Sequence, residues 1–352
     1  MGQVAEARGS HQPPLRQEAG LFPVRLLPGD RVFLVEEGED VLTAGLRQGI
    51  DLRYGCRHGK CTSCKYMVVE GDVVTRGASP YAFSDRELEE GAVLLCSTFA
   101  RSPLVITPFG EQPAPDGFVL IPPEQRTARV VSLAPTSAGL VELRLRPETA
   151  LSYRPGQYAE IGLPGSQERR SYSMTHPPDP SGDLTFLIDA RHRQVLDSLT
   201  ATADEELTVL GPFGRFFLRP AERPILMAAT GAGLGPLLAI LRELRAAGAT
   251  PPIRLYYGTR RGDAALAAEL DGLAGDMGGF EFVVVELEPQ RSPLLRLGPI
   301  IRRMAREVPD ASGHDAYVAG PVPLCDAVEA LLTAKGLPER RFFCERFYSV
   351  AT

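Results

Sequence analysis

Four cysteines constrain the fold of this chain more than any other feature of its sequence. Three follow the spacing Cys-x4-Cys-x2-Cys and the fourth lies further along: Cys56, Cys61, Cys64 and Cys96. Thiolates that reach a metal centre from one tight loop are stabilised by backbone N–H groups turned toward the sulfurs, and Gly55 and Gly59 permit the turns that this requires. We therefore expect this segment to fold around a metal centre.

The spacing of the cysteines is that of plant-type ferredoxins, which hold a [2Fe-2S] cluster. A structural zinc site usually has two short Cys-x2-4-Cys pairs, and only one close pair is present here. Cys56 and His58 resemble half of a Rieske site, but the partner Cys-x2-His is absent. Cys325 and Cys344 have no such spacing and are expected to be free thiols. We expect the four clustered cysteines to bind one [2Fe-2S] cluster, with zinc or buried inert thiols as the alternatives.

The composition excludes several classes of function. A chain of 352 residues with 44% hydrophobic and 23% charged residues has room for two or three globular domains. Its net charge of -6 provides no basic surface for nucleic acid. Residues 1–20 contain no apolar stretch typical of a signal peptide, and the uncharged run at 224–241 is broken by glycines and prolines. We expect a cytoplasmic protein with no membrane span and no nucleic-acid partner.

Proline-rich joints divide the chain into segments of different pattern. Residues 1–20 are expected to be a mobile tail, and residues 21–110, with short β-rich runs and one helical pattern, to form a small α+β, β-grasp-like domain. Residues 111–124 form a linker that prolines stiffen. Residues 125–220 contain strand-like runs and almost no helical pattern, which predicts an antiparallel β-barrel. Residues 221–352 alternate strands with helices, which predicts a parallel sheet with a nucleotide at the carboxyl ends of its strands.

A glycine-rich segment follows the apolar run 225–229. Its sequence is Thr-Gly-Ala-Gly-Leu-Gly-Pro. Glycines let backbone N–H groups approach a pyrophosphate, and the start of a helix favours an anion. A plain glycine turn between strand and helix is the alternative. The residues that we expect to contact the nucleotide here are Thr230, Gly231, Gly233 and Gly235.

The barrel segment contains Arg170-Ser171-Tyr172-Ser173, shortly after Tyr158. Together they resemble the flavin motif of the ferredoxin-NADP reductase family. The resemblance implies that Arg170 pairs with the flavin phosphate, that Tyr172 packs on the isoalloxazine or ribityl chain, and that Ser173 hydrogen-bonds near flavin N5. A guanidinium suits a diphosphate because it is a planar, permanently charged fork. A strand end with a surface arginine is the alternative.

The order of the three domains over residues 21–348 resembles the reductase component of bacterial multicomponent oxygenases. Soluble diiron monooxygenases and benzoate-type dioxygenases have such reductases. The resemblance implies FAD as the flavin, NADH as the donor, and an oxygenase hydroxylase component as the partner that takes electrons from the [2Fe-2S] cluster. The same modules can also serve a non-oxygenase acceptor, for instance a deoxysugar dehydratase.

Two further segments resemble this family. Gly320 and Pro321 resemble its second nicotinamide-side loop, and residues 342–347 resemble its last strand. The resemblance implies that Phe347 is the ring that covers the flavin and that Glu345 is the nearby acid. With Ser173 these form the expected catalytic residues.

The chain also departs from the family pattern. Ala319 stands where a cysteine usually precedes the Gly-Pro pair. The segment from Asp189 to Leu199 lacks the usual Gly-Gly and has its only hydroxyl at Ser198, although Arg191 and Arg193 could supply charge to the FAD phosphates. These departures leave open a degenerate redox sensor or regulatory subunit.

The nucleotide preference depends on the segment after the second strand of the parallel sheet. Arg260 lies where the adenosine ribose is expected, and an arginine there can meet the 2′-phosphate of NADPH. Reductases that this pattern resembles commonly use NADH even with such an arginine. We expect NADH, with NADPH as the alternative.

Overall fold

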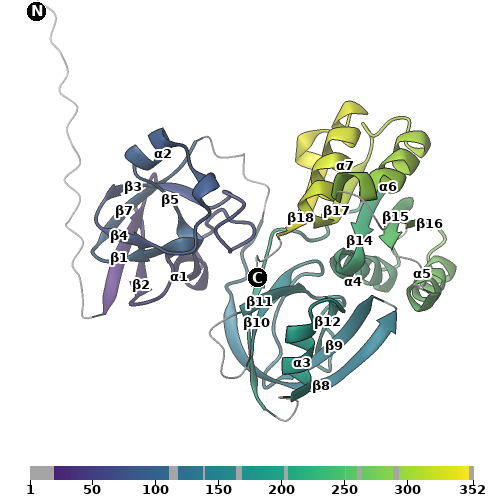
Figure 1. The fold of residues 1–352 in the computed structure, drawn as a ribbon, viewed down its shortest axis with the longest axis horizontal. Helices are drawn as coiled ribbons and strands as arrows, with labels where there is room; N and C mark the ends of the chain where they lie inside the picture. The colour runs from purple at the N-terminus through teal and green to yellow at the C-terminus, as the bar shows by residue number, and fades with distance from the viewer. Residues whose placement is uncertain are drawn as a thin grey trace, which may run out of the picture. The chain divides into compact units, whose positions relative to one another are not determined.

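The computed structural model describes residues 20–110, 118–137, 139–163, 169–201, 205–249, 251–259, 264–287 and 293–348. The chain forms two compact units, Met1–Leu120 and Ile121–Thr352 (Figure 1). Each unit has its own hydrophobic core.

The first unit is built on a mixed five-stranded sheet in the order β2-β1-β7-β3-β5, in which β1 and β7 are parallel. Its strands are β1 (Leu21–Leu26), β2 (Arg31–Glu36), β3 (Lys65–Glu70), β5 (Ala92–Leu94) and β7 (Leu104–Pro108). A second, two-stranded sheet contains β4 (Val73–Thr75) and β6 (Thr98–Ala100). The short helical elements are α1 (Val41–Arg47), α2 (Asp85–Glu89), η1 (Pro80–Ala82) and η2 (Leu95–Ser97). The predicted α+β fold of this unit is confirmed.

Helix α1 covers the core of the first unit. The Asp40 side chain caps it by accepting a hydrogen bond from Thr43 N at 2.9 Å, which satisfies one of the free N–H groups of the first turn. A Cβ on Gly45 would lie 2.4 Å from Leu52 Cδ1. The helix can therefore pack tightly against residue 52, just before the cysteine loop, because residue 45 has no side chain.

The second unit begins with an antiparallel six-stranded sheet in the order β11-β10-β13-β8-β9-β12. Its strands are β8 (Glu124–Ser137), β9 (Leu140–Pro147), β10 (Tyr158–Gly162), β11 (Arg169–Ser173), β12 (Leu184–Asp189) and β13 (Leu207–Phe213). The region also contains one helix, α3 (Arg193–Ala201), which the sequence pattern did not indicate. Leu199 is buried and Val195 and Leu196 pack against the barrel core. The apolar face of α3 is short and lies among charged residues, so the sequence pattern did not indicate a helix.

A parallel five-stranded sheet completes the second unit, in the order β16-β15-β14-β17-β18. Its strands are β14 (Ile225–Thr230), β15 (Ile253–Thr259), β16 (Phe280–Glu286), β17 (Asp315–Pro321) and β18 (Phe342–Phe347). Its helices are α4 (Leu234–Ala246), α5 (Ala264–Asp276), α6 (Pro293–Glu307) and α7 (Val322–Ala334), with the turns η3 (Gly231–Gly233) and η4 (Glu339–Arg341). The predicted parallel sheet is confirmed.

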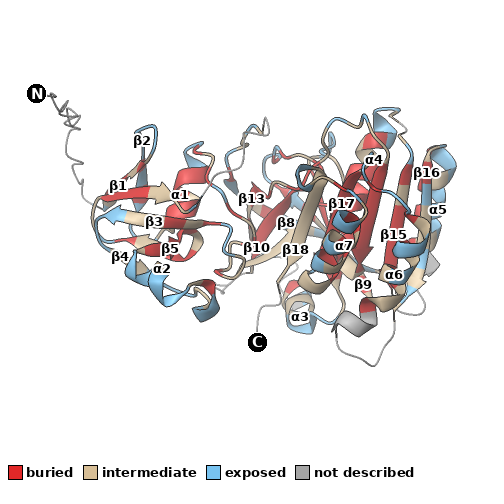
Figure 2. Ribbon diagram, turned by 90° about the horizontal axis from the view of Figure 1, so that it is seen from above, coloured by how far each residue is buried: buried red, intermediate tan, exposed pale blue. Residues whose placement is uncertain are grey.

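Helices cover both faces of the parallel sheet. Met227 and Ala229 belong to the core cluster that contains residues of α4 and α5, whereas Leu226 and Ala228 belong to the cluster with residues of α6 and α7. This alternation follows the two-residue period of a strand. Figure 2 shows the central strands buried between their helices. The sheet therefore presents only its edges, and above all its carboxyl edge, to a ligand.

The uncharged run at residues 224–241 does not form one continuous helix. It contains β14, the turn η3 and the first part of α4. Within the described ranges, no helix is long and apolar enough to cross a membrane.

Candidate functional site

The four predicted cluster ligands form two pairs in the first unit. Cys64 Sγ lies 3.3 Å from Cys96 Sγ, and the thiol of Cys56 is hydrogen-bonded to Cys61. Two pairs of thiolates provide two ligands for each iron of a [2Fe-2S] cluster. The residues present therefore fit a two-iron cluster.

The backbone of the cysteine loop is shaped to hold these sulfurs. Cys56 N donates to Cys61 Sγ at 3.2 Å, and His58 N donates to Cys56 Sγ at 3.4 Å. Gly59 has φ +69°, and a Cβ there would lie 2.5 Å from Gly77 O. The expectation that Gly59 permits a tight turn is thus confirmed, because any side chain would collide with backbone.

Each cysteine pair shares a hydrogen bond that favours one thiolate. The bond from Cys56 lowers the pKa of Cys61 to about 5, and the same bond raises the pKa of Cys56. Cys64 acts in the same way on Cys96, whose pKa is lowered. Iron binds the thiolate form, so binding of metal would displace the proton that each pair shares.

The predicted flavin motif lies on β11 and divides between the two faces of the sheet. Ser173 is paired with Tyr158 and Ser171 with Glu160 on the neighbouring β10. Residues opposite one another share a face, so Tyr158, Ser171 and Ser173 lie on one face and Arg170 and Tyr172 on the other. Burial raises the pKa of Tyr172 to about 12, which keeps its phenol protonated near neutral pH.

Tyr158, Glu345 and Gly214 meet at one place, although they are far apart in the sequence. A Cβ on Gly214 would lie 3.1 Å from Tyr158 Cδ1 and 3.4 Å from Glu345 Oε2. The last strand, β18, thus brings its predicted acid against the barrel. Because Tyr158 is paired with Ser173, two of the three predicted catalytic residues lie around the same tyrosine.

The glycine-rich segment joins β14 to α4 as predicted. A Cβ on Gly233 would lie 2.2 Å from Ala319 O, so the turn packs directly on the end of β17. A Cβ on Gly235 would lie 3.3 Å from Thr175 Cγ2 and 3.8 Å from Ser173 O, which places the start of α4 against the end of β11. The start of α4 has no side-chain cap. Its N–H groups are therefore suited to an anion.

The second predicted nicotinamide loop lies beside this turn. β14 and β17 are parallel neighbours, and a Cβ on Gly320 would lie 3.3 Å from Thr230 Oγ1. β18 continues the sheet in register, with Glu345 opposite Ala319 and Phe347 opposite Pro321. The structure thus brings the nucleotide residues and the third predicted catalytic residue to one edge of the sheet.

Two features of this edge were missed by sequence reasoning. The first is Cys325, whose Sγ lies 3.6 Å from Gly320 O and 3.8 Å from Glu345 O. It places a buried thiol behind the loop in which Ala319 replaces the usual cysteine. The position of Cys325 in the first turn of α7, shortly after the Gly-Pro pair, was the sequence feature that could have indicated its place behind this loop.

The second missed feature is a polar brace between the barrel and α4. Arg242 of α4 donates to Thr175 O and contacts His176 Nδ1 at 3.0 Å, and it pairs with Glu269 of α5. Burial and the nearby arginine lower the pKa of His176 to about 4. A lone arginine within an apolar helix pattern gave little indication of this contact.

The atypical segment after Asp189 is partly occupied by internal contacts. Arg191 pairs with Asp189, with Nε 2.9 Å from Oδ1. Ser198 donates to Gln194 O within α3 at 2.8 Å. Arg193, exposed at the start of α3, has no ion pair among the described residues. Arg260 lies outside the described residues.

Comparisons with known families match both units. Residues 24–101 match the 2Fe-2S iron-sulfur cluster binding domain, and residues 227–330 match the oxidoreductase NAD-binding domain. The reductase component of propane 2-monooxygenase from Rhodococcus jostii is 33% identical over 339 residues, which cover 92% of this chain and 90% of the relative. The electron transfer component of 2-halobenzoate 1,2-dioxygenase from Burkholderia cepacia is 31% identical over 319 residues, covering 88% and 92%.

Two solved structures of reductases are also similar to this chain over most of its length. The cytochrome P450 reductase GcoB of Amycolatopsis has a TM-score of 0.78 at 27% identity and covers 93% of this chain and 98% of its own. The ferredoxin reductase in carbazole 1,9a-dioxygenase has a TM-score of 0.74 at 26% identity and covers 93% and 98%.

Proposed function

This chain belongs to the reductase components of bacterial oxygenases, and we propose that it delivers electrons from NADH to an oxygenase hydroxylase component. Reductases of this family transfer electrons from NAD(P)H through FAD and a [2Fe-2S] cluster to oxygenases. The predicted fold class, enzyme class and cofactors are thereby confirmed. The identity of the acceptor, the choice of NADH and the roles of individual residues belong to the proposal.

One observation carries the proposal for the second unit. Tyr158, Ser173, Glu345 and the start of α4 at Gly235 come from separate segments and lie around the end of β11. Such convergence of barrel, glycine turn and last strand suits two stacked rings, one from each cofactor. When bound, FAD accepts a hydride from nicotinamide at N5 and releases single electrons, which the [2Fe-2S] cluster carries onward.

The residues of the barrel would hold and orient the flavin. Arg170 pairs with its phosphate and Tyr172 packs on its isoalloxazine or ribityl chain, while Ser171 and Tyr158 line the other face of the same strands. Ser173 would hydrogen-bond near N5, and Glu345 would be the acid close to it. Ordering of the two rings accounts for most of the expected rate, because hydride transfer requires close, aligned carbon and nitrogen atoms.

The carboxyl edge of the parallel sheet would hold the nucleotide. Backbone N–H groups at Gly231, Gly233 and Gly235 would bind the pyrophosphate, with the Thr230 hydroxyl beside them. A Cβ on Gly231 would point into open space, so this turn has room for a ligand. Gly320 and Pro321 border the nicotinamide, and Phe347 covers the flavin. Arg260 is assigned to the adenosine ribose without excluding NADH.

The acceptor is assigned from the names of the relatives. Two of them are a monooxygenase reductase component and a dioxygenase electron transfer component. Neither name favours a deoxysugar dehydratase, and an oxygenase component is therefore the acceptor that we propose. The four cysteines would deliver electrons to it from the first unit.

Anaerobic optical titration tests this proposal. Excess NADH should bleach both flavin and cluster absorption within seconds, because FAD and one cluster together accept three electrons and each NADH supplies two, and NADPH should do so more slowly. Addition of the oxygenase component of a propane 2-monooxygenase should then restore the cluster absorption. A chain that NADH does not bleach would contradict the reductase function, and a bleached chain that no oxygenase component reoxidises would contradict the acceptor.

A further inference from the structure

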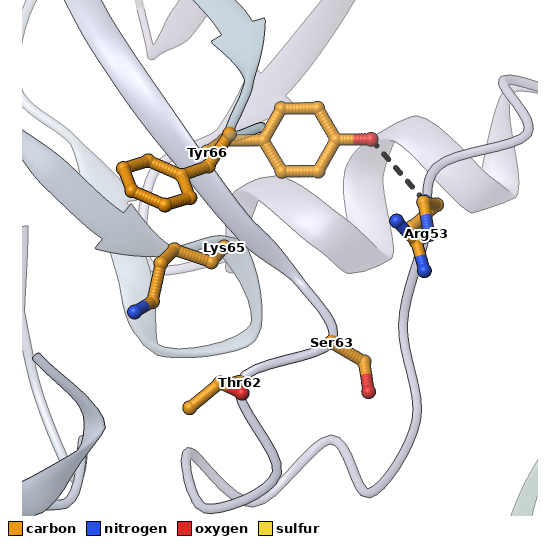
Figure 3. A pocket seen from close by; sticks show the side chains of 6 residues that line it. Arg53, Thr62, Ser63, Lys65 and Tyr66 are labelled. Carbon is orange, nitrogen blue, oxygen red and sulfur yellow. Dashed lines mark hydrogen bonds between the residues drawn. The ribbon is translucent and has the colours of Figure 1, made fainter. Parts of the chain in front are cut away.

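A pocket in the first unit lies directly beside the cysteine loop. Its volume is about 330 Å³, which is room for an inserted side chain and several waters. The residues that line it are Arg53, Thr62, Ser63, Lys65, Tyr66 and Phe109. Figure 3 shows Arg53 on one segment and Thr62 and Ser63 on the neighbouring loop. Because residues 62 and 63 separate two of the cluster ligands, any protein group in this pocket lies at the proposed electron exit.

One positive charge at the pocket has no ion-pair partner among the residues that the structure describes. Lys65 Nζ is paired with Glu87 at 2.7 Å, and its side chain is largely covered. Arg53 is exposed, and its guanidinium has no hydrogen-bond or ion-pair partner in the described part of the chain. Its backbone N–H donates to the hydroxyl of the buried Tyr66 at 3.2 Å, which fixes the backbone from which the side chain extends.

The remaining polar groups in the pocket are hydroxyls. Thr62 is exposed in the left-handed region at φ +60°, a strained conformation for this residue, and Lys65 N donates to its carbonyl at 3.1 Å. Ser63 is exposed and hydrogen-bonded to Cys61. A free guanidinium beside a hydroxyl donor matches a carboxylate, which accepts several hydrogen bonds and pairs with arginine in a fork.

We infer that this pocket receives an acidic side chain from the surface of the electron acceptor, with Arg53 as its partner. The inference rests on the proposed function and adds the chemistry of the docking surface to it. A charge at the exit orients the acceptor and raises the rate of encounter more than it raises the final affinity. The acceptor would therefore present Asp or Glu where it approaches the cluster.

Two forms of cytochrome c, which share the same heme but differ in surface charge, test this inference. Native cytochrome c has a basic surface, and succinylated cytochrome c carries carboxylates in place of its lysine charges. We expect Arg53→Glu to lower kcat/KM for the succinylated protein about tenfold at low salt and to raise it for the native protein. Both effects should disappear near 1 M salt, where the screening length is about 3 Å. Arg53→Gln should show the same directions with smaller effects.

Arg101→Glu is the matched control. Arg101 is also exposed and has no ion pair among the described residues. Its backbone N donates to Asp72 O, beyond Glu70 at the far end of β3 from Lys65. The variant makes the same change in net charge away from the pocket. Equal effects of both variants would overturn the inference, since only total charge would then matter.

The midpoint potential of the cluster distinguishes a docking role of Arg53 from a role in neutralising the charge of the cluster. If Arg53 only neutralised the cluster, Arg53→Gln would shift this potential and change both cytochromes in the same direction, which would overturn the inference. The inference predicts an unchanged potential and an unchanged rate of bleaching by NADH. Loss of bleaching in the unaltered protein would instead count against the proposed function.

Discussion

The two redox sites of this protein are built in opposite ways. Three of the four proposed cluster ligands lie on one loop, whose turns at Arg57, Gly59 and Thr62 adopt positive φ. The proposed flavin and nucleotide site draws on segments between Tyr158 and Phe347, and packing of separate elements brings them together. The first site is thus specified by local backbone geometry and the second by tertiary structure.

This difference predicts how each site should fail. A change in the cysteine loop should remove the cluster and leave the second unit intact. A change at a point of close packing in the second unit should disturb more than one segment at once, because each glycine contact joins two elements. Substitutions in the second unit should therefore disturb more of the structure than substitutions in the cysteine loop.

The largest effect is expected from Cys61→Ala. Removal of one ligand leaves an iron incompletely bound, so the cluster absorption should be lost and cytochrome c reduction should fall to background. Flavin should remain bound and reducible by NADH. Iron analysis and visible spectra measure both quantities. Cys325→Ser, which alters a cysteine of the second unit, should keep two irons per chain, and the persistence of two irons in Cys61→Ala would refute the ligand assignment.

Arg170→Ala should produce the next largest effect. Loss of a charge-assisted hydrogen bond costs about 1.5 to 3 kcal/mol, which corresponds to about 10- to 150-fold weaker FAD binding. Arg169→Ala is the control, because Arg169 donates to Gln125 Oε1 at 2.8 Å and lies on the opposite face of β11. Fluorescence titration should give the FAD dissociation constants of both variants and so show whether only Arg170 contributes to flavin binding. Equal FAD affinity in Arg170→Ala and the unaltered protein would show that the motif is only a strand end.

The sequence predicted local features better than it predicted contacts between elements. The cysteine spacing, the glycine turn after β14 and the apolar parallel strands each follow from neighbouring residues. Helix α3 was missed because its apolar face is short. The brace formed by Arg242 was missed because it depends on the packing of α4 against the barrel, to which no local pattern refers.

Gly233→Ala tests the tertiary character of the second site. The new Cβ would meet the Ala319 carbonyl, and backbone cannot easily move, so overpacking should cost about 1 to 3 kcal/mol. We expect KM for NADH to rise about 5- to 150-fold with FAD and cluster content unchanged. The Cβ of Gly235→Ala would meet the Thr175 methyl group at 3.3 Å and Ser173 O at an ordinary contact distance of 3.8 Å, so this variant should change KM far less. Steady-state kinetics of both variants should show this difference, and equal KM values would contradict it.

The smallest effect concerns pH. His176 has a folded pKa of about 4, below its ordinary value of about 6.5, because it is buried beside Arg242. Between about pH 6.5 and pH 4, this histidine is protonated in the unfolded chain and neutral in the folded chain. The free energy of unfolding should therefore fall as pH decreases from about 6.5 to about 4. The slope from this group should be less than about 1.4 kcal/mol per pH unit. Urea unfolding of His176→Gln at several pH values should show a shallower slope, and an unchanged slope would contradict the assignment.

We propose that electrons enter this protein through the second unit and leave through the first. The chain from Ile121 to Thr352 forms its own compact unit, so it can be compared with the full-length protein. Steady-state assays with NADH should give similar ferricyanide reduction by both, since ferricyanide takes electrons from reduced flavin. Cytochrome c reduction should be retained only by the full-length protein. Equal cytochrome c reduction by the two proteins would show that the cluster is not the exit and would contradict the account.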